Sequence, residues 1–194
     1  KRRERLKKQK RTSKEAQVED EALARIQEVL EAGGAARSIE LTDEEALMIK
    51  PLGLLTAKPI IYATNVSEDD LAAGNGYCEE VAALAEKEGA ESVRISAQVE
   101  AELVELGEQE CADYLQGLGV SEGGLRSLIR ATYRLLGLRT YFTTGEKETR
   151  AWTFRAGMTA PQTAGVIHTD FERGFIRAQT IGWEKLLDAG SLSE

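Results

Sequence analysis

The chain has 194 residues, of which 42% are hydrophobic and 30% charged, with 33 acidic against 25 basic residues. This composition excludes a disordered or collagen-like chain and provides apolar side chains for one good core or two small ones. No stretch approaches the ~18 consecutive apolar residues of a membrane span, and the start, KRRERLKKQKR, lacks the features of a signal peptide. With two cysteines and one histidine, the sequence indicates neither a zinc site nor a disulfide framework, so we expect free thiols in a reducing compartment.

Positive charge is concentrated at the beginning of the chain. Residues 1–14 hold nine basic residues and one acid, which leaves a net charge of −16 on the other 180 residues. A basic block on an acidic body is typical of a contact to a polyanion, because phosphate contacts release counterions wherever cations cluster. The alternative is a solvated helix end. Because the chain begins within a charged helical run and ends without a closing strand, we expect a fragment.

Helical periodicity comes first along the chain. Residues 15–32 predict an amphipathic helix that stops at Gly33-Gly34, and residues 1–11 predict the end of a preceding helix. A turn at Thr12-Ser13 joins the two into a hairpin with its basic charge at the tip. The predicted apolar face of the second helix consists of Val18, Ala22, Ile26, Val29 and Leu30.

A capping box and then a βαβ pattern follow. Thr42 with Glu45 three residues later predicts a short helix that ends near Pro51. Residues 58–64 (KPIIYAT) predict a strand buried on both faces, residues 75–88 a helix, and residues 92–96 a second strand. This order is typical of a parallel sheet, whose ligands bind beyond the carboxyl ends of the strands. The helix is expected to bury Tyr77, Val81, Leu84 and Ala85 and to stop at Gly89.

The remaining chain predicts helices and then a small α+β module. Residues 108–137 are helical in period, and their apolar stripe is interpreted as packing. Beyond a boundary near Gly137 the period shifts toward two, which predicts strands in RTYFTTG, ETRAWTFRA and RGFIRAQTI and a short helix around 161–167. The stripe consists of Leu125, Leu128, Ile129, Thr132, Leu135 and Leu136.

Polar side chains follow both predicted parallel strands. Asn65 and Glu68 come after the first strand, where a carboxylate can accept from purine ring donors and an amide can hold a neighbouring loop. A local cap or Asx turn is the alternative interpretation of this loop. Ser96, Ala97 and Gln98 follow the second strand, where small residues let backbone N–H groups approach a ligand. Together the two loops predict the base-binding half of a nucleotide pocket.

Several segments closely resemble the Obg-like ATPase (YchF) family of P-loop proteins. They are KPIIYATNVSEDD, ISAQVEAELVEL, GLRSLIRATYRLLGLRTYFTTGEKETRAWTF and APQTAGVIHTDFERGFIRAQTI, and the similarity extends over essentially the whole chain. The resemblance implies an α/β fold, the C-terminal half of a P-loop GTPase-like domain, with a helical coiled-coil segment and a partial α+β β-grasp (TGS) domain. The implied ranges are 1–32 for the end of the coiled coil, 33–137 for the nucleotide domain and 138–194 for the incomplete TGS domain.

The resemblance also implies a function. The intact protein is expected to be a ribosome-associated P-loop ATPase that binds and hydrolyses ATP, with GTP less favoured and Mg²⁺ as cofactor. The phosphate-binding motif G-x-x-x-x-G-K-[ST] does not occur in this sequence, so the catalytic groups and Mg²⁺ ligands are expected upstream and none is assigned here. A non-catalytic RNA- or ribosome-binding regulatory module is the alternative. Base recognition is assigned to Asn65, Val66, Glu68, Ser96, Ala97 and Gln98.

The partners implied are the ribosome, in particular its large subunit, or RNA, with no membrane and no DNA, in the cytoplasm or an organelle stroma. Contacts are assigned to Lys7, Lys8, Lys10 and Arg11 and to the TGS domain. His168 is interpreted as structural, because a lone histidine does not make a site, and Cys78 as partly buried and inert. The candidates for a second basic surface for RNA are Arg150, Arg155, Arg173 and Arg177.

Overall fold

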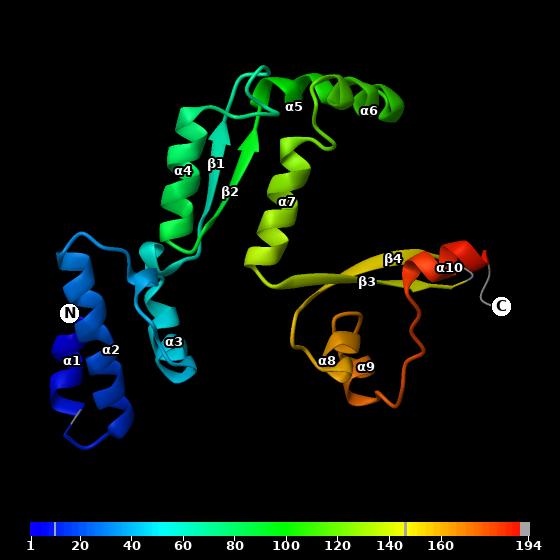
Figure 1. Ribbon diagram of the computed structural model, residues 1–194. Coiled ribbons are helices and arrows are strands. Elements are labelled where there is room, and N and C mark those ends of the chain that lie inside the picture. Colours follow the sequence, from blue (N-terminus) through cyan, green and yellow to red (C-terminus); the bar gives the residue numbers. More distant parts are fainter. Residues whose placement is uncertain (10, 146, 191–194) are drawn as a thin grey trace. The chain divides into compact units, whose positions relative to one another are not determined.

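The computed structural model describes residues 1–9, 11–145 and 147–190. Two compact units divide the chain, one of residues Lys1–Thr132 and one of residues Tyr133–Glu194 (Figure 1). The first unit holds a helical hairpin, a short helical segment and a two-stranded parallel sheet with its helices. The second unit holds a two-stranded antiparallel ribbon with three short helices.

A helical hairpin opens the first unit, as the sequence predicts. Helix α1 (Arg2–Gln9) and helix α2 (Lys14–Glu31) lie side by side, and the hydroxyl of Ser13 caps α2 by accepting from the Ala16 N–H. The hairpin contributes to one apolar cluster, which consists of Leu6, Ala16, Ala22, Leu23, Ile26, Ala36 and Ile49.

The expectation that the basic charge of the hairpin lies at its tip is wrong for the first two arginines, which pair with α2. Arg2 binds Glu19 of α2 through two hydrogen bonds of 2.6 and 2.9 Å, and Arg3 donates to Asp20 at 3.0 Å. Glu19 and Asp20 are each only 7% exposed. Buried carboxylates require charged or polar partners, so these two arginines hold the helices together.

A short helical segment leads from the hairpin to the sheet. Helix α3 (Asp43–Ile49) begins with the predicted capping box, in which the Thr42 hydroxyl accepts from the Glu45 N–H and the Glu45 carboxylate accepts from the Thr42 N–H. The 3₁₀ turns in this segment are η1 (Ala36–Ser38), η2 (Lys50–Leu52) and η3 (Leu55–Ala57).

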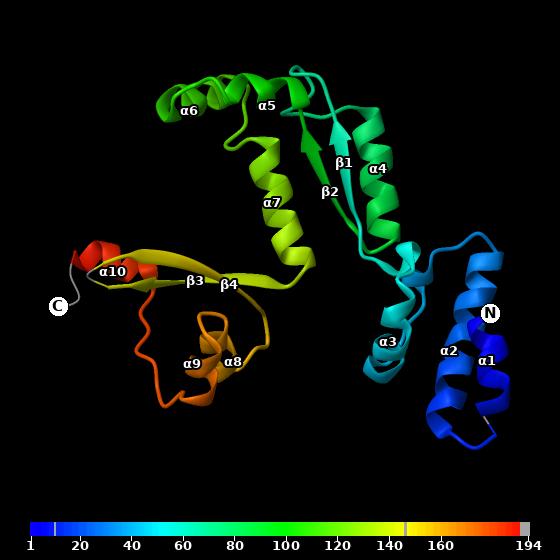
Figure 2. The ribbon, with the colours of Figure 1, turned by 180° about the vertical axis from the view of Figure 1, so that it is seen from behind.

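The predicted βαβ unit is confirmed. Strand β1 (Ile61–Asn65) pairs in parallel with β2 (Glu91–Ile95), and helix α4 (Gly76–Lys87) contacts both strands (Figure 2). The expectation of a strand buried on both faces is wrong, because all five residues of β1 are at least partly exposed. Within the described residues, β1 pairs with β2 alone. On α4, Ala85 is buried but Tyr77 is 79% exposed, contrary to its predicted place on the buried side.

Three helices follow β2 within the first unit: α5 (Ala97–Leu103), α6 (Glu108–Gly117) and α7 (Gly124–Leu135), the last of which runs past the unit's end. Helix α7 starts against β2, where a Cβ on Gly124 would lie only 2.7 Å from the Ile95 Cα. The apolar stripe of α7 is packed only in part, since Leu125 and Ile129 remain 50% and 49% exposed.

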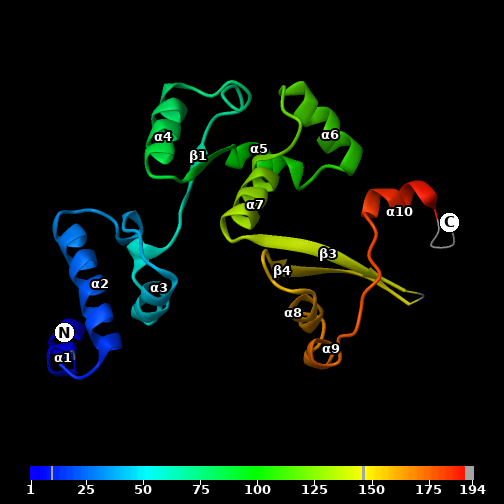
Figure 3. The same ribbon diagram turned by 60° about the horizontal axis from the view of Figure 1, so that its bottom comes forward.

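The second unit is built on an antiparallel ribbon. Strands β3 (Leu138–Thr144) and β4 (Thr149–Arg155) pair from Leu138 with Arg155 to Thr144 with Thr149. Helices α8 (Ala160–Gly165) and α9 (Thr169–Arg173) contact each other beneath the ribbon (Figure 3), and the chain continues to α10 (Trp183–Ala189).

The prediction of a third strand in the second unit is wrong. Residues 174–182 form neither helix nor strand and are almost all exposed. They pair with neither β3 nor β4, and a β-type sequence becomes a strand only through such pairing. The short helix predicted around 161–167 is present as α8.

The described part of the chain offers neither a membrane span nor a cluster of metal ligands. Within residues 1–9, 11–145 and 147–190, no helix is both long and apolar enough to cross a bilayer. The same residues contain no group of three or more His, Cys, Asp or Glu side chains arranged to hold a metal ion.

Candidate nucleotide-base site

The carboxyl ends of β1 and β2 are joined by a side chain. Asn65, the last residue of β1, accepts a hydrogen bond through Oδ1 from the N–H of Ala97, the first residue of α5, at 3.0 Å. Beside it, the Val66 N–H donates to the carbonyl of Ile95 at 2.9 Å. The two loops that the sequence singles out are therefore in contact, and the Asn65 amide bridges them instead of capping its own loop.

The loop that follows β1 is tied by its own polar side chains. The carboxylate of Asp70 accepts from the Ser67 hydroxyl at 3.2 Å and from the Asn75 amide at 2.8 Å. Asn75 in turn caps α4 by accepting from the Cys78 N–H. Arg94 of β2 donates to the Ala72 carbonyl at 2.9 Å. These bonds fix the path of residues 66–75, which a base-binding loop requires.

The turn after β2 is the start of a helix. Ser96 is 1% exposed and caps α5, its Oγ lying 3.5 Å from the Val99 N. Ala97 and Gln98 are exposed in the first turn of the helix. Gln98 donates through Nε2 to Oε1 of Glu102, one helical turn later, at 3.2 Å.

Glu68 lies in an acidic environment that includes a tyrosine. The hydroxyl of Tyr114 on α6 donates to Oε2 of Glu102 at 2.5 Å. This hydrogen bond, followed by desolvation and the charges of Glu102 and Glu68, raises the pKa of Tyr114 to about 12. The same hydrogen bond, followed by that from Gln98, lowers the pKa of Glu102 below its usual range. At neutral pH the tyrosine is therefore a proton donor and Glu102 is ionised.

The backbone beside Asn65 offers a carbonyl oxygen as an acceptor for a base. The Val66 N–H is occupied by Ile95, whereas the Val66 carbonyl and the Ser67 N–H have no hydrogen-bond partner within the described parts of the chain. These two groups belong to one trans peptide and point in opposite directions, so only one of them can face a base. The Val66 carbonyl can accept from the N6 donor of adenine, whereas guanine presents the acceptor O6 at that position. A carbonyl that faces position 6 can therefore distinguish the two purines.

The structure does not bring the other predicted residues to this site. His168 caps α9, where its Nδ1 accepts from the Asp170 N–H at 3.2 Å, which agrees with a structural role. Cys78 is partly buried against an apolar cluster. Arg150 stacks over Trp152 at 4.3 Å from the ring centre. The four arginines of the proposed second basic surface, Arg150, Arg155, Arg173 and Arg177, all belong to the second unit and are exposed.

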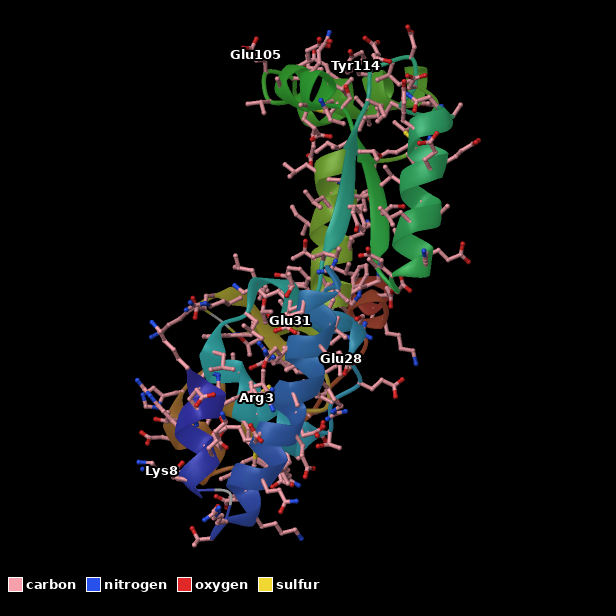
Figure 4. The ribbon with its side chains drawn as sticks, turned by 90° about the vertical axis from the view of Figure 1, so that its left-hand side faces the viewer. Arg3, Lys8, Glu28, Glu31, Glu105 and Tyr114 are labelled. Atoms are coloured by element: carbon pink, nitrogen blue, oxygen red, sulfur yellow. The ribbon has the colours of Figure 1, made fainter. Side chains whose placement is uncertain are left out.

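The basic residues of the hairpin differ in how they are used. Lys7 forms an ion pair with Glu4 at 2.7 Å, whereas Lys8 points away from α2 (Figure 4) and Arg11 is exposed. Lys10 lies outside the described residues. Two further members, Arg2 and Arg3, hold the hairpin together, so the exposed charge of the block is smaller than the sequence implies.

Sequence reasoning missed two residues of this region, Glu102 and Tyr114. The spacing of Gln98 and Glu102, four residues apart on a helix, could have indicated that they interact. No sequence signal places Tyr114 on Glu102. A shallow depression of about 720 Å³ between α2 and α3 contains none of the predicted site residues; it is lined by Glu21, Ala24, Arg25, Glu40, Leu41, Thr42 and Glu45.

Comparisons with known proteins give relatives over nearly the whole chain. It is 48% identical over 186 residues to the ribosome-binding ATPase YchF of Bacillus subtilis, which covers 95% of the chain and 51% of that protein. The proteins of the same name from Haemophilus ducreyi and Escherichia coli O157:H7 are 49% and 48% identical, over 93% of the chain and 50% of each relative. The chain thus spans about half the length of the curated relatives it matches.

A family match and a solved structure agree with these relatives. The family YchF-GTPase_C, described as a protein of unknown function (DUF933), matches residues 138–194. The structure of the Schizosaccharomyces pombe YchF GTPase superposes with a TM-score of 0.78 at 33% identity, covering 91% of this chain and 47% of that one.

Proposed function

Because the chain belongs to the YchF family by sequence and by fold, we propose that it is part of a ribosome-associated P-loop ATPase that binds and hydrolyses ATP in preference to GTP. In this proposal the chain contributes base recognition and partner contacts. The phosphate-binding motif is absent from its sequence, and we assign it no catalytic residue.

The hydrogen bond between Asn65 and Ala97 is the observation that carries the proposal. The bond, 3.0 Å between Asn65 Oδ1 and the Ala97 nitrogen, joins the ends of the two parallel strands. This is the edge of the sheet at which open α/β folds bind their ligands. The bond also occupies the Ala97 N–H, so this donor is not free to meet an acceptor such as guanine O6. We assign base recognition to Asn65, Val66, Glu68, Ser96, Ala97 and Gln98.

Preference for ATP follows from the backbone beside Val66. Its carbonyl accepts from adenine N6, whereas guanine would place the acceptor O6 against the same carbonyl. Such a mismatch leaves polar groups unpaired in a desolvated contact, which costs about 1–3 kcal/mol per group. Glu68, one methylene longer than aspartate, is displaced from the position in which a carboxylate accepts from guanine.

Mg²⁺ is the cofactor expected with ATP, and its ligands are not assigned to this chain. When bound, the ion would neutralise charge on the phosphates. We assign the groups that hold the phosphates and the ion to sequence outside this chain. The described residues supply the base end of the site only.

Contact with the ribosome is assigned to the exposed cations of the hairpin. Lys8 and Arg11 are exposed, and phosphate contacts of this kind are strongly dependent on salt. We assign residues 1–32 to the end of a coiled-coil insertion, 33–137 to the nucleotide domain and 138–194 to a TGS domain. The proposed location is the cytoplasm, where a ribosome-binding protein meets its partner.

A second candidate is a non-catalytic RNA- or ribosome-binding module. It is favoured by the basic hairpin together with the absence of the phosphate-binding motif from the sequence. The two candidates differ in whether the base loops bind a nucleotide when the rest of the family's nucleotide domain is present.

The test is calorimetric titration of ATP and of GTP into the full-length protein that contains this chain and into the 194-residue chain alone. We expect ATP-selective binding by the full-length protein and none by the chain alone. Failure of the full-length protein to bind either nucleotide, with salt-sensitive ribosome binding retained, would favour the second candidate.

A further inference from the structure

Three polar side chains connect the start of α5 to α6. Gln98 donates to Oε1 of Glu102 at 3.2 Å, and Tyr114 donates to Oε2 of the same carboxylate at 2.5 Å. Both oxygens of Glu102 are thereby used by different partners. Within the described residues, no hydrogen bond reaches Oε1 of Gln98, which leaves the carbonyl as the free end of this carboxamide.

Tyr114 is held independently of Glu102. Its side chain packs against the buried cluster of Val66, Leu71 and Val99, of which the first two belong to the loop after β1. Val66 supplies the backbone carbonyl of the proposed base contact. The tyrosine is therefore placed by apolar packing under one base loop, while its hydroxyl reaches the carboxylate that binds the other.

We propose that Glu102, placed by Tyr114, is a positioning residue that fixes the Gln98 carboxamide with its carbonyl oxygen toward the 6-position of the bound purine. The proposal deepens the proposed function and rests on it. It concerns selection for a 6-amino purine over a 6-oxo purine.

The chemical reason is that a carboxamide has a donor end and an acceptor end, and a carboxylate accepts only. An ionised Glu102 can pair with the NH₂ end of Gln98 alone, so the acceptor end is left for the ligand. The acceptor end attracts an N6 amine and repels an O6 oxygen. The lowered pKa of Glu102 and the raised pKa of Tyr114 keep these protonation states constant around neutral pH.

Glu102→Gln is the decisive variant because it keeps the shape and lets Gln98 pair in either orientation. Binding of ATP and of inosine triphosphate to the full-length protein is measured by calorimetry. The purines of these two nucleotides differ only at position 6 and at N1, and neither carries the 2-amino group of guanine. We expect E102Q to lower the ratio of ATP to inosine triphosphate affinity about fivefold, as expected for one hydrogen bond.

Further variants show whether Glu102 acts through Gln98. Gln98→Ala should lower the affinity ratio to the same extent, and the double variant should lower it no further, because the two residues act as one unit. Tyr114→Phe should lower it less. Glu105→Gln, at a nearby exposed glutamate, is the matched control and should leave the ratio unchanged. A purely structural role would weaken both nucleotides equally and leave the ratio intact.

Each outcome decides the question. If the unaltered protein prefers ATP but E102Q and Q98A keep its ratio, this inference is wrong while the proposed function stands. If E102Q acts equally strongly in the Q98A background, Glu102 does not work through Gln98 and the inference is again wrong. If the unaltered protein binds neither nucleotide, the proposed function fails. Should E102Q not fold, Q98A tests the carboxamide and Y114F tests the placement of Glu102, and a ratio unchanged in both variants would contradict the inference.

Discussion

Asn65 and Ala97 lie 32 positions apart in the sequence, and the Asn65 side chain accepts the Ala97 N–H at 3.0 Å. The bond closes the edge at which both parallel strands end. The asparagine thus holds a distant loop. A local cap would instead have accepted an N–H two or three residues further along the chain.

Replacing Asn65 by alanine should loosen the base site. N65A removes the acceptor and leaves the Ala97 N–H without its partner, so we expect about 1 kcal/mol of lost stability and about tenfold weaker ATP binding. Asn65→Asp keeps an acceptor oxygen at the same place. Amide hydrogen exchange at Ala97 should accelerate in N65A and not in N65D; equal exchange in the two variants would show that the bond has no such role.

Glu68→Asp should move nucleotide preference toward GTP. In our proposal the longer Glu68 side chain is displaced from the position in which a carboxylate accepts from two guanine N–H donors, and the shorter aspartate can occupy it. Competition titrations of ATP and GTP with the full-length protein measure the change. Selectivity that stays the same in E68D would contradict our account of the base loops.

Reversing charge at Lys8 and Arg11 should weaken ribosome association and reduce its dependence on salt, with ATP affinity unchanged. Both residues are exposed, and the slope of affinity against salt becomes shallower with every cation that no longer meets a phosphate. Co-sedimentation with ribosomes at several salt concentrations measures both quantities. An unchanged slope in the charge-reversed variant would show that these two residues do not meet phosphate.

The control for this experiment is Arg2→Glu, which should act on folding instead. Arg2 pairs with Glu19, which is 7% exposed, so R2E places two carboxylates together at a buried position. Adding Glu19→Arg should restore the hairpin. If R2E leaves thermal stability unchanged, the ion pair does not hold the two helices together.

Gly124→Ala should destabilise the first unit. The added Cβ would lie 2.7 Å from the Ile95 Cα and 2.9 Å from the Arg94 carbonyl oxygen, and both are backbone atoms that cannot rotate away. We expect a loss of about 1–3 kcal/mol in urea unfolding. Gly117→Ala, where nothing lies within 4 Å of the added Cβ, is the matched control and should be near neutral.

Stability at acidic pH should depend on Glu88. Hydrogen bonds from Arg37 and then from Tyr62 hold the pKa of Glu88 below its usual value of 4.5. A lowered pKa in the folded state stabilises above the unfolded value and loses this contribution as pH falls through the folded one. Thermal unfolding below pH 4.5 should therefore decline more steeply in the unaltered protein than in E88Q. Glu86→Gln should decline as the unaltered protein does.

The local elements were predictable where a short pattern sets them. The capping box of Thr42 and Glu45, the stop of α4 at Gly89 and the helical hairpin all depend on neighbours within a few residues, and all are confirmed. Exposure was predicted less well. Tyr77 sits at an apolar position of the helical period, yet it is exposed because no other element of the first unit covers it.

The strand predicted in segment 174–182 is absent for a related reason. Its alternation is that of a strand, but a strand also needs an edge with which to form hydrogen bonds. Likewise, the first two arginines of the basic block were counted as free charge. In the structure Arg2 pairs with Glu19 and Arg3 with Asp20, each 17 positions further along the chain. Sequence patterns reveal periodicity and composition, not which distant group becomes a partner.

Periodicity, turn residues and motifs are local properties, so the parallel βαβ unit, the two loops at its carboxyl edge and the family resemblance can be recognised from the sequence. The hydrogen bond between Asn65 and Ala97, and the link from Tyr114 to Gln98 through Glu102, become visible in the folded chain alone. These contacts depend on how β1, β2, α5 and α6 pack around Val66, Leu71 and Val99. Packing of that kind is set by the whole chain, and no short segment encodes it.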